Sequence, residues 1–209
     1  MRRGELQSYG ELLSQLDGQR VVLVTGEPAS KGPVSIAIAT AASAAGSRTA
    51  LVECDLAHPS LAGSLELAAA PGLHEYLRWD AEASQILQAL VLAGPGSAAA
   101  EEPLVCVVAG EPTTRGSVLL SAESFRQAVE RLRGAYELLV LCAPSLEEEA
   151  LVGLVAERSD VALAAVCRQA ASGRRGRRLK RAMRRLPAPG LGLVLHEASS
   201  PEAHPPPGG

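Results

Sequence analysis

Aromatic side chains are scarce in this chain, with one Phe, one Trp and three Tyr among 209 residues. Hydrophobic residues still make up 47% of the sequence, so Ala, Val and Leu must build the core. The length is sufficient for one domain with a full hydrophobic core. The scarcity of aromatics also disfavours nucleic acid as a partner, because few side chains are available for base stacking.

Long apolar runs are also missing. No stretch reaches the roughly 18 uninterrupted apolar residues that a membrane-spanning helix needs. The first twenty residues are charged throughout and lack the apolar segment of a signal peptide. We therefore expect a cytoplasmic protein that reaches the inner face of the cell membrane, if at all, through a partner.

Paired cysteines are absent. Cys54, Cys106, Cys142 and Cys167 lie singly in apolar runs, with no C-x-x-C spacing. This pattern favours buried thiols in a reducing compartment over a zinc site or a disulfide framework. The four histidines are scattered, so the sequence predicts no histidine-containing metal cluster.

Apolar runs of strand length alternate with helical patterns along the chain. The predicted strands are residues 21–25, 49–53, 104–109, 137–141, 160–166 and 190–195. This alternation predicts a doubly wound α/β fold, with a mainly parallel sheet and helices on both faces. We expect a lead-in helix over residues 1–17, the α/β domain over 18–197 and a disordered Pro/Gly-rich tail over 198–209. Residues 81–90 read as helical.

A Gly-rich loop over residues 26–33 follows the first predicted strand, and an Ala-rich helix over residues 34–46 follows the loop. Strand, glycine loop and helix form the layout of a phosphate-binding loop, in which backbone N–H groups hold an anion. The chemistry of such a loop calls for G-x-x-x-x-G-K-[ST]. Here Gly32 is followed by Pro33 and Val34.

Several segments resemble, in order, the bacterial tyrosine-kinase family of capsular and exopolysaccharide biosynthesis. This family is a branch of the deviant P-loop ATPases, the superfamily that also includes MinD and ParA. TGEPASKGPVS resembles its phosphate loop, LVECDLAHPSL its second acidic motif, and PGLHEYL the stretch that follows. The segment from GEPTTRGSVLL to LLVLCAPS resembles the approach to its third motif. The similarity covers residues 18–196 and implies a P-loop NTPase-like fold that binds ATP or ADP with Mg²⁺.

The departures from this family fall on the ionic positions. The loop lysine of the family falls at Pro33, its magnesium-binding hydroxyl at Val34 and its third-motif aspartate at Cys142. Glu53 replaces the first aspartate of the second motif, and Ala57 replaces its arginine. Phosphoryl transfer depends on positioning and on charge neutralisation by Lys and Mg²⁺, so we expect no robust catalysis.

Active members of the family resemble one another in a C-terminal tyrosine cluster that they autophosphorylate. The tyrosines of this sequence are Tyr9, Tyr76 and Tyr136. We therefore expect no tail autophosphorylation in this chain.

Part of the ancestral site remains. Asp55 is a candidate catalytic residue and metal ligand, although a leftover strand-end acid is the simpler interpretation. Lys31 precedes Gly32 and offers an alternative route to a phosphate from a different backbone position. The degenerate phosphate loop comprises Gly26, Ser30, Lys31, Gly32 and Ser35.

A strongly basic segment lies near the end of the chain, without an acidic residue among its members. They are Arg174, Arg175, Arg177, Arg178, Lys180, Arg181, Arg184 and Arg185. Two interpretations stay open, namely contact with an anionic surface or a solvated helix that covers the sheet.

Three functional hypotheses follow. The leading one is a catalytically degenerate, cytoplasmic regulatory or binding partner in extracellular polysaccharide biosynthesis or export. The resemblance implies a membrane-embedded chain-length regulator or an active kinase paralogue as its partner, and self-association stays open. The second is an active tyrosine kinase or ATPase with a rearranged loop, and the third is a MinD/ParA-type positioning protein acting on membrane or DNA.

Overall fold

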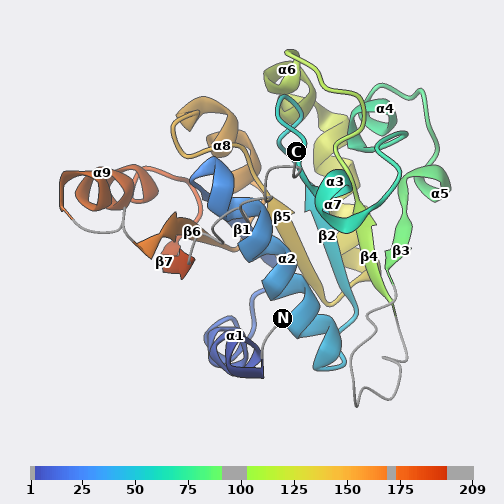
Figure 1. Ribbon diagram of the computed structural model, residues 1–209. Helices are drawn as coiled ribbons and strands as arrows, with labels where there is room; N and C mark the ends of the chain where they lie inside the picture. The colour runs from blue at the N-terminus through green and yellow to red at the C-terminus, as the bar shows by residue number, and fades with distance from the viewer. Residues whose placement is uncertain (1–2, 91–102, 169–172, 197–209) are drawn as a thin grey trace, which may run out of the picture.

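A seven-stranded sheet forms the centre of the molecule (Figure 1). The computed structural model describes residues 3–90, 103–168 and 173–196. The strand order is β3-β4-β2-β5-β1-β6-β7, and β3 is antiparallel to β4, whereas the other neighbours run parallel. The strands are β1 (Val21–Gly26), β2 (Thr49–Glu53), β3 (Gln88–Leu90), β4 (Leu104–Val107), β5 (Leu138–Cys142), β6 (Val161–Cys167) and β7 (Gly190–His196). The predicted doubly wound, mainly parallel fold is confirmed.

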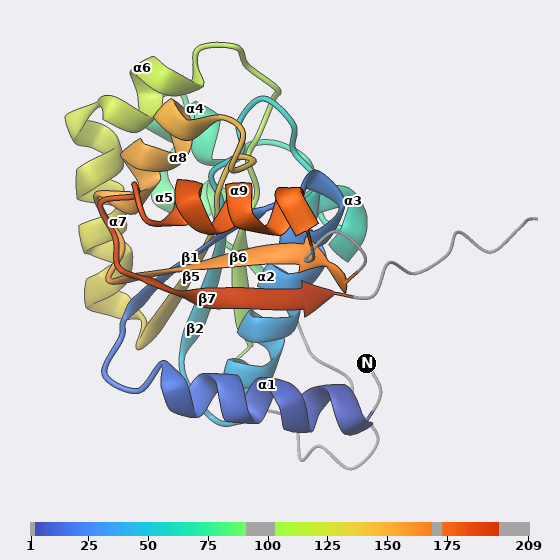
Figure 2. The ribbon, with the colours of Figure 1, turned by 90° about the vertical axis from the view of Figure 1, so that its left-hand side faces the viewer.

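Helices cover both faces of this sheet (Figures 1 and 2). They are α1 (Arg3–Gln15), α2 (Pro28–Ala44), α3 (Leu61–Leu65), α4 (Leu73–Leu77), α5 (Ala83–Ile86), α6 (Gly116–Ser121), α7 (Glu123–Ala135), α8 (Glu149–Ala156) and α9 (Gly173–Met183). Among the described residues, no helix combines the length and apolar character needed to cross a membrane. The predicted tail over 198–209 lies outside the described residues.

The strands send alternate side chains to two separate hydrophobic clusters. Val21 and Leu23 of β1 join the cluster beneath α4, α7, α8 and α9, whereas Val22 and Val24 join the one beneath α1 and α2. This period of two is the normal geometry of a strand buried on both faces. Apolar residues at consecutive positions of β1 therefore serve two cores at once.

The segment over residues 81–90 differs from its prediction. It was expected to be one helix, but α5 ends at Ile86 and β3 begins at Gln88. Residues 88–90 pair with residues 104–106, and the Gln88 side chain donates to and accepts from the Ala68 backbone. Pairing with a distant strand therefore outweighs the local helical pattern, which is too short to decide the matter.

Candidate functional site at the carboxyl ends of the central strands

The segments that follow β1, β2 and β5 meet at one edge of the sheet. These strands are neighbours in parallel register, with Val24 opposite Cys142 and Cys142 opposite Glu53. Ligands of open α/β sheets bind outside the carboxyl ends of the strands. The predicted phosphate loop and the predicted acidic position Asp55 therefore lie together.

Helix α2 begins well before the predicted boundary at Val34. It starts at Pro28, and the Ser30 and Lys31 N–H groups donate to the Glu27 carbonyl at 2.9 and 3.0 Å. The predicted loop over residues 26–33 is therefore wrong beyond Glu27. Proline suits the first helical position because its φ is already fixed and its missing N–H would not be bonded there.

The early start of α2 changes what its backbone can bind. A phosphate loop needs successive N–H groups that point at the anion. In this chain the corresponding residues form helical turns, and Pro33, inside α2, has no N–H to offer. The backbone here is a helix and does not form an anion cradle.

Lys31 and Asp55 form a buried ion pair at this edge of the sheet. The Lys31 Nζ donates to Asp55 Oδ2 at 2.7 Å, and each side chain is only 3% exposed. Burial disfavours the ammonium, but Cys142, the hydrogen bond to Asp55 and the carboxylates of Asp55 and Glu53 act against it and raise the pKa of Lys31. Lys31 is therefore charged at neutral pH. Ser35 lies one turn along α2, and its hydroxyl donates to the Lys31 carbonyl at 2.7 Å.

Glu53 is held by donors on two segments. Its Oε1 accepts from the Ser60 N–H, the Ser60 hydroxyl and the Leu61 N–H, and its Oε2 accepts from the Ala109 N–H. The side chain therefore ties the start of α3 and the end of β4 to β2. It acts as a structural acceptor at the position of the second-motif aspartate.

Cys142 stands where the third acidic motif would place its aspartate. The side chain is fully buried. Burial, only partly offset by Lys31, raises the pKa of the Cys142 thiol to about 11. The thiol is therefore protonated in the folded chain at neutral pH, which makes it a weak nucleophile.

Gly26 is required by packing, and Gly32 marks a close approach between α2 and the loop before α3. Gly26 has a φ of +125°, and a Cβ on it would lie 2.0 Å from the Ala165 carbonyl oxygen. A Cβ on Gly32 would lie 3.3 Å from the Ser60 hydroxyl, so α2 packs closely on the loop before α3. Buried Ser30 lies in the first turn of α2. Within the described ranges, every buried side-chain N or O atom has a hydrogen-bond partner, so this closed site leaves none of them awaiting a ligand.

A cavity of about 460 Å³ opens beside the first turn of α2, bounded by the β5–α8 loop and α9. Three glutamates line it, Glu27, Glu147 and Glu149, against one arginine, Arg178. A polyphosphate would meet an excess of negative charge there. The cavity lies at the carboxyl ends of the central strands, and its described lining is more acidic than basic.

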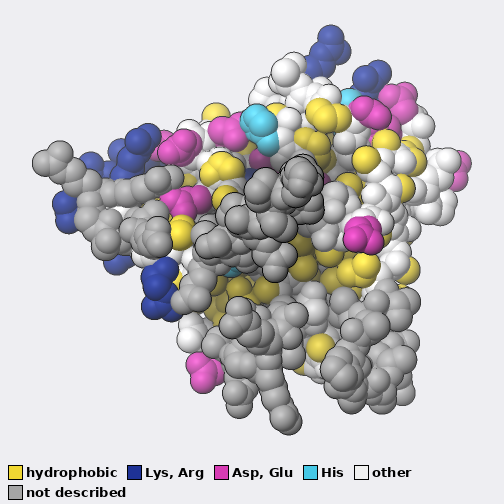
Figure 3. All heavy atoms as spheres, in the orientation of Figure 1, with side chains coloured by type: hydrophobic (Ala, Val, Ile, Leu, Met, Phe, Trp, Pro, Cys, Tyr) yellow, Lys and Arg dark blue, Asp and Glu magenta, His cyan; other side chains and the backbone are white. Residues whose placement is uncertain are grey.

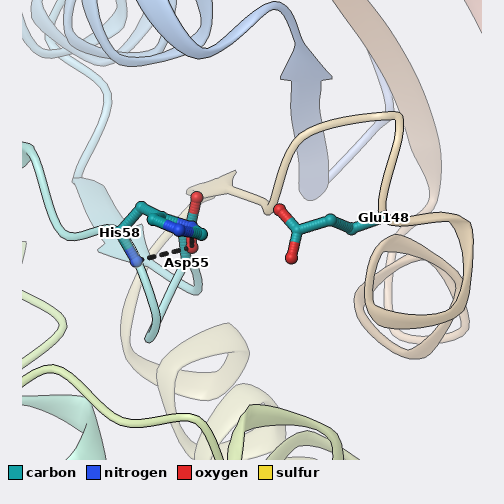
Figure 4. A group of neighbouring side chains, drawn as sticks. All are labelled: Asp55, His58 and Glu148. Carbon is teal, nitrogen blue, oxygen red and sulfur yellow. Dashed lines mark hydrogen bonds and ion pairs between the residues drawn. The ribbon is translucent and has the colours of Figure 1, made fainter.

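A second group of side chains contains Asp55 together with His58 and Glu148 (Figure 4). Asp55 Oδ1 accepts the His58 N–H at 3.0 Å and lies 3.6 Å from His58 Nδ1. Glu148, at the N-cap of α8, completes a group whose ligand-type atoms all lie within 4.8 Å of one another. The scattered histidines of the sequence did not indicate that His58 lies in such a group. The Asp-x-x-His spacing was visible in the sequence, but Glu148 reaches the group only through the parallel pairing of β2 with β5.

The basic segment forms α9 and the turn that follows it. Leu179 and Met183 are buried on the sheet side, and Figure 2 shows α9 lying over β6 and β7. Exposed cations occupy the outer side, namely Arg177, Arg178, Lys180, Arg181, Arg184 and Arg185. They gather at the α9 end of the molecule in Figure 3. The side chains of Arg174 and Arg175 lie outside the described residues. The helix covers the sheet, and contact with an anionic surface stays a prediction.

Comparisons with known proteins place this geometry in a known fold. No protein-family model and no curated protein sequence matches the chain. Among solved structures, the kinase domain of the Escherichia coli tyrosine kinase ETK superposes with a TM-score of 0.77 at 16% identity, covering 95% of this chain and 79% of that one. The VpsO kinase domain gives a TM-score of 0.74 at 19% identity, with 94% and 97% covered. MinD from Pyrococcus horikoshii with Mg-ADP gives a TM-score of 0.60 at 16% identity. The superposition covers 88% of this chain and 74% of MinD. The chain therefore has the fold shared by bacterial tyrosine-kinase domains and MinD-type ATPases.

Proposed function

We propose that this chain is a catalytically degenerate P-loop kinase-like protein that binds or regulates a partner in extracellular polysaccharide biosynthesis or export. The observation that carries the proposal is the Lys31–Asp55 ion pair on a phosphate-loop segment that has become helical. The likeness in fold to ETK and VpsO kinase domains supports the kinase-like assignment.

The ion pair opposes nucleotide binding for an electrostatic reason. In P-loop enzymes the metal neutralises the carboxylates and phosphates, and the loop lysine contacts the phosphates. In this chain Lys31 already neutralises Asp55. A nucleotide would have to unwind the first turns of α2 and separate the pair, and this reorganisation reduces its affinity.

The proposed mode of action is therefore binding to another protein. The partner we propose is a membrane-embedded chain-length regulator or an active kinase paralogue, met at the cytoplasmic face of the membrane. The exposed cations of α9 supply a surface for an acidic segment of that partner.

A second candidate is supported by one arrangement. Lys31, Ser35 and Asp55 lie together, as an active enzyme with a rearranged loop would require. Such an enzyme would have to turn Lys31 from Asp55 to a phosphate. The two candidates differ in nucleotide binding and in its dependence on Lys31.

Isothermal titration of the full chain with ATP and with ADP, each with and without Mg²⁺, tests the proposal. We expect no binding heat at millimolar nucleotide and no ATP hydrolysis. The matched variants are Lys31→Ala and Lys180→Ala, which change the two lysines of the chain.

Mg²⁺-dependent ATP binding that Lys31→Ala abolishes and Lys180→Ala retains would overturn the proposal in favour of the rearranged enzyme. Co-sedimentation with anionic vesicles that weakens steeply with salt would favour a MinD/ParA-type positioning protein instead.

A further inference from the structure

We propose that Asp55, His58 and Glu148 form a binding site for a divalent transition-metal ion of the zinc class, separate from any nucleotide. The three side chains come from two segments, the loop after β2 and the start of α8 (Figure 4). Imidazole nitrogen and carboxylate oxygen are both ligands that zinc takes in proteins.

The spacing of the ligand atoms suits such an ion. Ligand atoms at about 2.0–2.2 Å from a tetrahedral ion lie roughly 3.3–3.6 Å apart. Asp55 Oδ1 and His58 Nδ1 are already 3.6 Å apart. Glu148 is half-buried and lies within 4.8 Å of both, so a change of its side-chain torsions closes the remaining distance.

Asp55 is fixed in an orientation that leaves one oxygen facing the other two residues. Lys31 holds Oδ2, and the His58 N–H binds Oδ1 while leaving a second lone pair on that oxygen. Hydrogen bonds of this kind to a ligating carboxylate orient it and are a regular part of metal sites. The His58 side chain is 74% exposed, so an ion can enter from solvent.

The composition of the group suits a divalent cation. Two of its three members, Asp55 and Glu148, are carboxylic acids, and His58 offers an imidazole nitrogen. Carboxylate oxygens and imidazole nitrogens are the ligands that such ions take in proteins.

The ligand types separate this site from a magnesium site. Mg²⁺ prefers oxygen ligands and keeps several waters, whereas imidazole favours zinc and its neighbours. The buried thiols of Cys54, Cys106 and Cys142 are not members of this group of ligand atoms.

Titration of the full chain with ZnCl₂ in a buffer free of nucleotide and chelators tests the site. We expect saturable binding of one ion per chain, weakened at least tenfold by His58→Ala and by Glu148→Gln. The matched controls, Glu147→Gln and His196→Ala, remove an adjacent exposed carboxylate and a distant imidazole and should bind as the unaltered chain does. Circular dichroism confirms that each variant is folded.

Absence of zinc binding at about a hundred micromolar ion would overturn this proposal, as would unchanged affinity in both site variants. Equal affinity for Mg²⁺ would overturn the assignment to the zinc class. Because no nucleotide is present, either result leaves the proposed function untouched, and ATP binding would in turn leave the zinc result untouched.

Discussion

At the scale of single residues, the buried Lys31–Asp55 ion pair is the central feature of the candidate site. Two oppositely charged groups, each 3% exposed, are stable in the interior only because they are paired and hydrogen-bonded. Each of them therefore depends on the other. The pair also places a positive charge beside the carboxylate that a bound metal would neutralise in a P-loop ATPase.

Replacing Lys31 with Met should destabilise the fold by about 3–5 kcal/mol, because Asp55 is then left buried without its cation. The Lys180→Met control changes an exposed lysine on α9 and should stay within about 0.5 kcal/mol of the unaltered chain. Urea unfolding at pH 7 measures both. Similar free energies of unfolding for the two variants would show that the buried pair contributes little.

The departures from the resembled family could be recognised in the sequence. The hydrogen-bond partners of the site residues could not be predicted from it. Pro33, Val34 and Cys142 stand visibly at ionic positions of the resembled family. That Lys31 points at Asp55 depends on the phase of a helix that begins at Pro28, and the sequence pattern predicted a loop there. A side chain's partner depends on backbone placement that residue types alone do not give.

At the scale of elements, the junction between β1 and α2 is the tightest connection near the site. Gly26 combines a φ of +125° with a backbone contact that leaves no room for a Cβ. The neighbouring Ser145 hydroxyl donates to the Gly26 carbonyl at 3.2 Å, which ties the β5–α8 loop to the same point. A backbone distortion at Gly26 would therefore affect the start of α2 and also the β5–α8 loop, both of which border the cavity.

Gly26→Ala should destabilise the chain by more than about 3 kcal/mol, since it adds a backbone clash to an unfavourable φ. Gly134→Ala is the matched control, because Gly134 lies in α7 with nothing within 4 Å of a Cβ. That control should stabilise the chain by about 0.4–1 kcal/mol. Chemical denaturation of both variants provides the comparison, and a tolerated Gly26→Ala would contradict the close approach to Ala165.

Elements with long apolar patterns were predictable, and short ones were not. The β2 prediction over residues 49–53 agrees with the observed strand, because its Val and Leu residues are buried on both faces. The three-residue β3 has no pattern of its own and exists through pairing with β4. The start of α2 was misplaced because Gly and Pro indicate a loop wherever tertiary context does not override them.

At the scale of the whole molecule, the buried core of the described residues contains one aromatic side chain, Phe125, and three thiols. Cys54, Cys106 and Cys142 are all buried. Burial raises the pKa of Cys106 to about 12 and that of Cys142 to about 11, and it raises the pKa of Cys54 well above the usual range. Each of these groups stays protonated in the folded chain at a pH at which it ionises in the unfolded one.

The chain should therefore lose stability as the pH rises above about 9. A group whose pKa is higher in the folded state contributes stability that is fully present below the pKa of the unfolded chain and is lost above it. Each such thiol lowers the free energy of unfolding by about 1.4 kcal/mol per pH unit, until its folded-state pKa is reached.

Urea unfolding at pH 7.5, 9 and 10 tests this expectation, and Cys106→Ala should reduce the slope by one thiol's share. Lys31, whose pKa is also raised, keeps its contribution below about pH 10.5. A free energy of unfolding that does not change between pH 9 and 10 would contradict the expected burial of these thiols.

The fold class was readable from the whole sequence because strands and helices alternate along it and each strand is nearly continuous in apolar residues. The site was readable only in its position, at the carboxyl ends of the strands. The arrangement of side chains within the site depends on where α2 begins. That position is set by a few backbone hydrogen bonds, which residue types alone do not predict.

The helical start of α2 also limits what a single substitution at this site can change. A lysine placed at Pro33 would add a cation to a segment whose N–H groups are already bonded within the helix, near an Asp55 that already holds Lys31. An acid placed at Cys142 would bury a charge beside that pair. Either change alone leaves the helix and the ion pair in place, so a new binding role for this edge of the sheet would need several substitutions at once.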